Sequence, residues 1–191
     1  MKIMVVDACV RGEKSRTKML YEQLLKQQAM NAEIEIVKLA EEPLAPLTAE
    51  QSELRDSLVR QGRLEHELFR YARGFREADR IIIAAPYWDL SFPSVLKVYL
   101  EHVCAAGVTF GYEGAESVGY CKAEKIIYLS TCGGCVQGAH LGAEYVRGLG
   151  AMLGIHSFQQ FAVQGLDIDP LQADAIMEEG ISQMLSQISI L

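Results

Sequence analysis

The chain has 191 residues, of which 50% are hydrophobic and 23% charged, and its formal net charge is −7. This length predicts a single domain over residues 1–191 that is large enough to fold around its own core. The composition excludes disordered, collagen-like and disulfide-dense proteins. The acidic balance argues against a nucleic-acid-binding protein.

No segment of the sequence reads as a secretion signal or a membrane span. The apolar run after Met1 is short, and the longest one, Ile81–Ala85, falls far below the roughly 20 residues that a bilayer requires. The five cysteines are odd in number and do not form an extracellular disulfide pattern. We therefore expect a cytoplasmic protein with reduced thiols and no membrane partner.

The first third of the chain alternates between strand and helix patterns. Lys2–Val6 is a compact β run, and Ser15–Met30 carries an apolar stripe at helical spacing. Glu33–Leu39 alternates apolar and charged residues, which is typical of a strand near a sheet edge. A connection with two prolines, Glu41–Leu47, separates this strand from the next segment.

The middle of the chain predicts a helical segment followed by a buried strand. Thr48–Gly74 is polar and helix-prone, with Thr48 as a possible N-cap and Gly62 as a break. Arg80–Ala85 is β-branched without alternation, as expected for a strand that is buried on both faces, and Pro86 ends it.

The remaining elements continue the alternation. Two strands are predicted, at Lys125–Leu129 and Ser157–Val163. Three helices are predicted, at Ser94–Ala105, Gln137–Leu153 and Pro170–Ile190, the last with Asp169 as its N-cap. Five strands with helices between them favour an α/β fold, in which a parallel sheet of order 2-1-3-4-5 lies between two helical layers.

Ligands of such folds bind beyond the carboxyl ends of the strands, where the strand order reverses between strands one and three. The loops at this edge are Ala8–Lys14, Pro86–Pro93 and Thr131–Val136. The first loop opens a helix, and a helix start binds phosphate through its free N–H groups. Neither a dinucleotide fingerprint nor a Walker loop is present.

Each of the three loops allows a functional and a structural interpretation. Ser15 and Thr17 could donate hydroxyl hydrogen bonds to a phosphate, or Ser15 could simply cap the helix. Tyr87 and the single tryptophan, Trp88, could contact a flat ring system or pack as a lid. The glycines of the third loop allow a planar ligand to approach the backbone closely.

Together these residues resemble the FMN-dependent NAD(P)H:quinone oxidoreductase and NADH-azoreductase family, which has a flavodoxin-like fold. The strongest match is Ala85–Val103, continued by Gly107–Tyr112. Ser15–Thr17 with Leu20 gives a second match, and Thr131–Gly134 gives a third. The three matches together span most of the chain.

The resemblance implies a flavodoxin-like α/β/α sandwich, non-covalently bound FMN, NADH or NADPH as co-substrate, and a homodimer. It implies that the phosphate is held by Ser15, Arg16 and Thr17. It implies that the isoalloxazine lies between two groups of residues, namely Pro86, Tyr87, Trp88, Asp89 and Leu90 on one side and Thr131, Cys132, Gly133 and Gly134 on the other. Phe110 and Tyr112 match a segment that shapes the substrate cavity, in some members across the dimer.

The expected activity is hydride transfer from NAD(P)H through flavin to a quinone, azo or similar aromatic acceptor in a ping-pong scheme. No catalytic side chain is assigned, although Tyr87, Tyr112 or His102 could donate a proton. The alternative is an FMN-binding electron carrier or regulatory protein without NAD(P)H turnover. The four histidines lack metal-site spacing, so we predict no metal.

Three residues depart from the family pattern. Asp89 stands where Asn is frequent, Cys9 where Ser is common, and Cys132 where Arg or another polar residue is frequent. An ionised Asp89 facing the ring would lower the flavin potential, unless it points away. Cys132 and Cys135 form a C-x-x-C, which allows a thiol relay beside a helix start; the simpler interpretation is that they fill space while the glycines serve the flavin.

Overall fold

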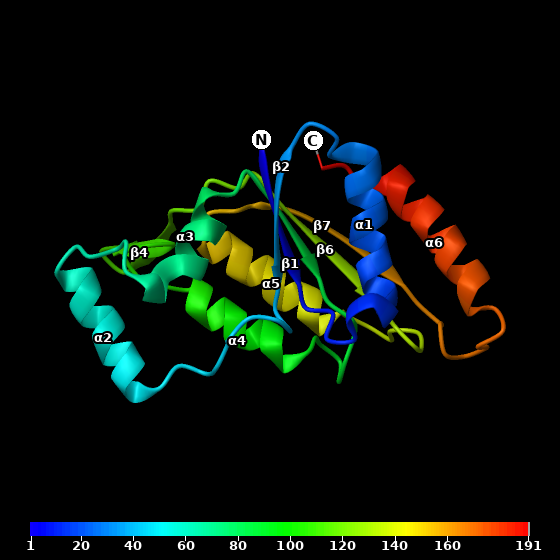
Figure 1. Ribbon diagram of the computed structural model, residues 1–191, viewed down its shortest axis with the longest axis horizontal. Helices are drawn as coiled ribbons and strands as arrows, with labels where there is room; N and C mark the ends of the chain where they lie inside the picture. Colours follow the sequence, from blue (N-terminus) through cyan, green and yellow to red (C-terminus); the bar gives the residue numbers. More distant parts are fainter. Residues whose placement is uncertain (191) are drawn as a thin grey trace.

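A five-stranded parallel sheet forms the centre of the computed structural model, which describes residues 1–190 (Figure 1). The strands are β1 (Lys2–Asp7), β2 (Glu33–Lys38), β3 (Arg80–Ala84), β4 (Phe110–Glu113), β5 (Glu116–Gly119), β6 (Lys125–Thr131) and β7 (Ser157–Val163). The central sheet has the order β2-β1-β3-β6-β7, in which β6 and β7 are its fourth and fifth strands. The predicted 2-1-3-4-5 topology is therefore confirmed.

Residues 1–190 contain six α-helices, all of which except the second cover the sheet. They are α1 (Arg16–Gln28), α2 (Ala49–Arg60), α3 (Arg70–Glu77), α4 (Ser94–Val103), α5 (Leu141–Met152) and α6 (Ala173–Gln187). Two short 3₁₀ turns lie at Gly12–Lys14 and Glu67–Phe69.

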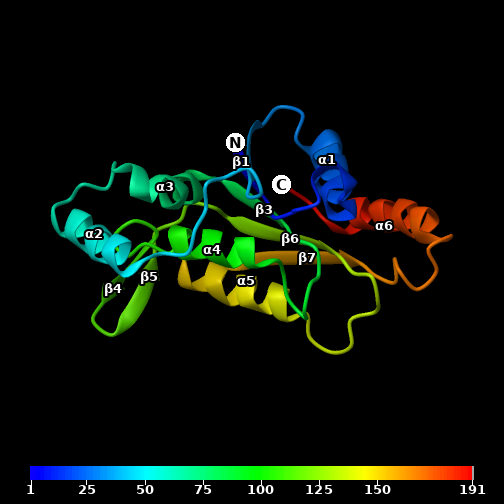
Figure 2. The same cartoon turned by 60° about the horizontal axis from the view of Figure 1, so that its bottom comes forward.

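The helices form one layer on each face of the sheet, as the two views of Figures 1 and 2 show. The α1 and α6 side is packed around Ile82 and Leu129, whereas α3, α4 and α5 pack on the opposite face around Ile81 and Ile83. Adjacent residues of β3 thus enter two different cores. This explains why its sequence shows no polar alternation.

The segment between β2 and β3 follows the sequence prediction closely. Thr48 caps α2 in a reciprocal capping box with Gln51, with backbone-to-side-chain distances of 3.1 and 3.2 Å. Gly62 has a φ of +68° and separates α2 from the next helical turn. The helical prediction ended at Gly74, but α3 continues to Glu77. Leu58 is the one buried residue of α2, which lies at the margin of the molecule (Figure 1).

Two helices begin later than the sequence predicts. Helix α5 begins at Leu141 and not at Gln137, because Gly138 has a φ of +83° and leaves the helical region. Helix α6 begins at Ala173, and the expected cap Asp169 instead closes a turn by accepting a hydrogen bond from the Leu171 N–H at 3.0 Å.

The β4–β5 hairpin was not predicted as strands. Its two four-residue strands pair antiparallel around Gly114, which has a φ of +65°. Helix α4 runs away from the carboxyl edge of the sheet and β6 begins at the amino edge, so the hairpin between them belongs to the amino-edge end of the molecule (Figure 1).

Within residues 1–190, no helix has both the length and the apolar character needed to cross a bilayer. Nor does this part of the chain bring three or more His, Cys, Asp or Glu side chains together in a metal-binding arrangement.

Candidate functional site

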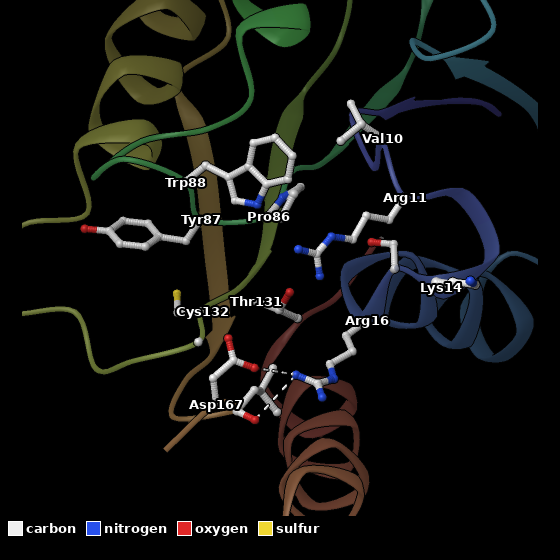
Figure 3. Close-up of a pocket in the computed structure, with 13 residues that line it drawn as sticks. Val10, Arg11, Lys14, Arg16, Pro86, Tyr87, Trp88, Thr131, Cys132 and Asp167 are labelled. Atoms are coloured by element: carbon white, nitrogen blue, oxygen red, sulfur yellow. Dashed lines mark hydrogen bonds and ion pairs between the residues drawn. The ribbon is translucent and has the colours of Figure 1, made fainter. Parts of the chain in front are cut away.

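A pocket of about 300 Å³ opens at the carboxyl edge of the sheet, where the strand order reverses between β1 and β3 (Figure 3). Its walls come from the loops after β1, β3, β6 and β7. It is lined by Val10, Arg11, Lys14, Ser15, Arg16, Pro86, Tyr87, Trp88, Thr131, Cys132, Gly133, Leu166 and Asp167. All three loops selected from the sequence therefore meet at one site.

A buried carboxylate holds the loop between β1 and α1. The Asp7 carboxylate accepts a hydrogen bond from the Cys9 N–H at 2.8 Å and another from the Tyr21 hydroxyl at 2.9 Å. Asp7 and Tyr21 are both almost fully buried. Burial raises the pKa of the Cys9 thiol, so this residue is a neutral thiol beneath the loop.

The start of α1 is left open to an anion. Ser15 occupies the N-cap position, but its side chain makes no capping hydrogen bond, and the first turn of α1 contains no acidic residue. The sequence-based alternative in which Ser15 serves only as a cap is therefore not supported by the geometry. The first-turn N–H groups retain the partial positive charge that binds phosphates at helix starts.

Thr17 connects the first turn of α1 to the end of β6. Its Oγ1 lies 2.6 Å from Oγ1 of Thr131, and Thr17 is completely buried. Thr131 lines the pocket, whereas Thr17 lies behind the lining. The hydrogen bond between the two hydroxyls fixes two walls of the pocket relative to each other.

The loop after β3 forms the aromatic wall of the pocket with Tyr87 and Trp88, and it continues into a tight turn. Trp88 and Ser91 exchange backbone hydrogen bonds at 2.7 and 3.2 Å, and the residues between them, Asp89 and Leu90, have φ values of 50° and 65°. This is the geometry of a type I′ turn. Tyr87 and Trp88 line the pocket, but Asp89 and Leu90 do not, because the turn directs them outward. The contact of Asp89 and Leu90 with the isoalloxazine therefore stays a prediction, and Asp89 is exposed.

The glycine-containing loop is joined to the segment that follows β7. Residues 132–134 accept backbone hydrogen bonds from residues 165–167 at 2.8 to 3.2 Å. A Cβ atom on Gly133 would lie 2.3 Å from Oδ2 of Asp167, so a side chain at this position would have to displace the Asp167 carboxylate. Gly134 is exposed and lies outside the pocket lining, so its contact with the cofactor stays a prediction.

The structure does not support the thiol-relay hypothesis. It requires Cys132 to lie at a helix start, but α5 begins only at Leu141. Burial raises the pKa of the Cys132 thiol to about 11, which is the opposite of activation. Cys132 therefore behaves as a small buried residue in the pocket wall, while Cys135 is exposed.

The pocket is cationic on one side. Arg11 directs its guanidinium group into the cavity, and Arg16 extends toward Asp167 (Figure 3). The Nη1 atom of Arg16 lies 3.1 Å from Oδ1 of Asp167. Sequence reasoning overlooked Leu166 and Asp167; the available signal was that the loop after the last strand must reach the same sheet edge.

Three other candidates do not join this pocket within one chain. Phe110 and Tyr112 lie in β4 with ring centroids 5.7 Å apart, and Phe110 lines a separate hollow of about 420 Å³ beside α2. His102 Nε2 lies 2.8 Å from the Ala45 carbonyl oxygen. Among the candidate proton donors, Tyr87 alone lines the pocket.

Comparison with known proteins agrees with this arrangement. The sequence model of a family described as having a flavodoxin-like fold matches residues 1–188. FMN-dependent NADH:quinone oxidoreductase 2 of Clostridium acetobutylicum is 33% identical over 165 residues, which cover 84% of this chain and 82% of that protein. The chain belongs to the FMN-dependent NADH:quinone oxidoreductase family. The family recognised from the sequence is thereby confirmed.

Solved structures also share the fold of this chain. An azoreductase from Bacillus anthracis strain Sterne matches with a TM-score of 0.83 at 24% identity, covering 97% of each chain. An FMN-dependent NADH-azoreductase from B. anthracis strain Ames Ancestor, solved in complex with FMN, matches with a TM-score of 0.78 at 18% identity. It covers 97% of this chain and 98% of that structure.

Proposed function

We propose that this protein is an FMN-dependent oxidoreductase that takes hydride from NADH or NADPH and reduces a quinone, azo compound or similar small aromatic acceptor. One observation carries the proposal: the uncapped start of α1 opens into the same pocket as an aromatic wall and a glycine wall. FMN combines an anionic phosphate with a flat ring system, and the pocket offers matching surfaces for both.

The phosphate end of the cofactor fits the first turn of α1. Ser15 would donate its hydroxyl group, and the first-turn N–H groups together with Arg16 would supply positive charge. The hydroxyl of Thr17 is already bonded to Thr131. We therefore assign Thr17 a contribution through its backbone N–H and through positioning the turn.

The ring end fits between the second and third loops. Pro86, Tyr87 and Trp88 would flank one side of the isoalloxazine, and Thr131–Gly133 would flank the other. The missing side chain at Gly133 gives a planar edge access to backbone N–H groups. Asp89, Leu90 and Gly134 would act through the shapes of their turns.

The chain's own contribution to the reaction is to bind FMN, to orient the substrate on the flavin ring and to shield the ring from water. FMN, when bound, supplies the chemistry of accepting a hydride from NAD(P)H and passing two electrons to an acceptor, which is consistent with ping-pong kinetics. Trp88 is 38% exposed at the pocket mouth and offers flat contact area to a planar substrate. Tyr87 lines the pocket, but Figure 3 shows its hydroxyl group directed away from Arg11 and Thr131, so we assign no proton donor.

We also propose that the enzyme is a cytoplasmic homodimer. Large apolar side chains remain exposed at both ends of the molecule, including Leu90 (63%) and Tyr112 (68%). Leu90 lies beside the pocket loop and Tyr112 in the β4–β5 hairpin, so both are available for contact with a second subunit. In a dimer, Phe110 and Tyr112 could reach the pocket of the partner subunit, as the family resemblance implies. The free cysteines suit a reducing compartment.

The test is an absorption spectrum of the purified protein with FMN, followed by anaerobic addition of NADH and then of a quinone. We expect a bound flavin spectrum that NADH bleaches and the quinone restores; a parallel titration with NADPH measures the co-substrate preference. A protein that does not bind FMN would contradict the proposal. Bound FMN that both NADH and NADPH leave oxidised would favour the carrier or regulatory alternative.

A further inference from the structure

Asp167 places a negative charge in an otherwise cationic pocket. The lining contains Arg11, Lys14 and Arg16, and Asp167 is its one acidic residue. In the part of the chain that the structure describes, Arg11 and Lys14 have no acidic side chain at ion-pair distance, whereas Arg16 does. Nη1 of Arg16 lies 3.1 Å from Oδ1 of Asp167 and 3.4 Å from the Leu166 carbonyl oxygen. A pocket suited to an external anion thus already contains one of its own.

The helix itself explains why Arg16 needs an anion. Arg16 is the first residue of α1, where the partial positive charge of the helix start disfavours a cation. The first turn has no acidic residue and no side-chain cap to offset this charge. Asp167 provides the missing negative charge from a loop 151 residues away along the chain.

The backbone of Asp167 is fixed, whereas its carboxylate is free to move. The Asp167 N–H donates to the Gly133 carbonyl at 2.8 Å, and the Leu166 N–H donates to the Cys132 carbonyl at 3.2 Å. The Asp167 side chain is 74% exposed, and Figure 3 shows it at the open side of the pocket facing Arg16. The side chain can therefore rotate away from Arg16 without disturbing the loop that carries it.

We propose that Asp167 is an internal competitor for the phosphate of FMN, holding Arg16 in the free protein and yielding it when the cofactor binds. This inference rests on the proposed function, because it takes FMN as the ligand. Binding then exchanges one ion pair of Arg16 for another, so the guanidinium contributes less to affinity than an unpaired one would. A phosphate monoester carries up to two negative charges and displaces a single carboxylate, whereas uncharged riboflavin gains nothing from Arg16.

Asp167→Asn tests this directly, because it removes the charge and preserves the size of the side chain. We expect the Kd of the apoprotein for FMN, measured by flavin fluorescence, to fall roughly twofold to fivefold, the range for one largely exposed charge pair. The Kd for riboflavin should not change. Glu178→Gln is the matched control: it removes one exposed charge from α6 outside the pocket and should alter neither constant.

Repeating the Asp167→Asn substitution in an Arg16→Gln variant separates competition for Arg16 from a general effect of charge. In Arg16→Gln, the additional change Asp167→Asn should improve FMN binding by a smaller factor than it does in the wild type. Unchanged FMN binding by Asp167→Asn would overturn the proposal by showing no competition, and weaker binding would overturn it by showing that Asp167 positions Arg16 for the phosphate. An equal gain for riboflavin would also overturn it.

Failure of the proposed function would be visible separately. If the wild-type protein binds no FMN, the proposed function is wrong, and inorganic phosphate becomes the probe for Asp167. Phosphate should then raise the Tm of Asp167→Asn more than that of the wild type. Equal shifts in the two proteins would overturn the role of Asp167 as a competitor for anions.

Discussion

At the carboxyl edge of the sheet, buried side-chain hydrogen bonds hold the pocket, whereas at the amino-edge end the β4–β5 hairpin packs through glycine, and Arg55 joins α2 to the end of α4 by hydrogen bonds to two backbone carbonyls. Asp7 and the pair Thr17–Thr131 fix the pocket loops from within the core. Helix α2 buries only Leu58, and the hairpin meets the end of α5 through Gly119. The pocket is thus preorganised for binding, whereas at the amino-edge end the backbone of β5 packs closely against the backbone at the end of α5.

The largest expected effect is at the amino-edge end. In Gly119→Ala, the new Cβ would lie 1.9 Å from the Leu153 carbonyl carbon and 2.0 Å from the Gly154 nitrogen. Because both neighbours are backbone atoms, we expect the free energy of unfolding to fall by about 3 kcal/mol. Urea denaturation measures this change.

Gly148→Ala is the control, since a Cβ there meets nothing within 4 Å and lies inside α5. It should stabilise the protein by about 0.5–1 kcal/mol. Wild-type stability in Gly119→Ala would show that the hairpin does not pack on α5 as described.

Tyr21→Phe tests the buried hydrogen bond between Tyr21 and Asp7 beneath the pocket. It removes the hydroxyl donor from the buried Asp7 carboxylate. We expect a loss of about 1.5–3 kcal/mol in the free energy of unfolding, together with weaker FMN binding, because Asp7 also holds the Cys9 N–H. Tyr112→Phe, at an exposed position, should change stability by less than about 0.5 kcal/mol. Equal effects of the two substitutions would remove the contrast between the two ends.

The Thr17–Thr131 hydrogen bond should show measurable coupling. Thr17→Val and Thr131→Val each remove one hydroxyl, and the double variant removes both. Each single change leaves a buried hydroxyl unpaired. We therefore expect the sum of the two single losses in unfolding free energy to exceed the loss in the double variant by about 1 kcal/mol. Strict additivity would indicate that the two walls of the pocket are independent.

The smallest effect should come from the cap of α2. Thr48→Ala breaks the capping box with Gln51. The local cost is about 0.5–2 kcal/mol, and because α2 packs weakly we expect it to appear mainly as faster hydrogen exchange within α2. Thr48→Ser, which retains the hydroxyl group, should preserve the slow exchange. A matching drop in global stability would show that α2 folds as part of the core.

The features that could be predicted from the sequence were those set by local patterns. Unbroken β-branched residues identified β3, and the Thr48 cap and the Gly62 break fixed the ends of α2. The alternation of strands and helices along the chain then predicted the sheet order, and the sheet order predicted the position of the pocket. Ser15, Tyr87 and Thr131 were placed at the pocket by this reasoning alone.

The features that could not be predicted depend on contacts between distant segments or on unusual backbone angles. Asp167 reaches the pocket only because residues 165–167 pair with residues 132–134. The outward direction of Asp89 follows from positive φ values at Asp89 and Leu90, and the side-chain preference of leucine does not suggest such an angle. The late start of α5 depends on the backbone conformation of Gly138.

The most direct test of the site as a whole is to compare FMN with riboflavin as ligands of the apoprotein, using flavin fluorescence. If the open start of α1 binds the phosphate, FMN should bind at least about tenfold more tightly than riboflavin, because charge-assisted hydrogen bonds form only with the phosphate. Equal affinities for the two flavins, or no binding of either, would contradict the assignment of the pocket.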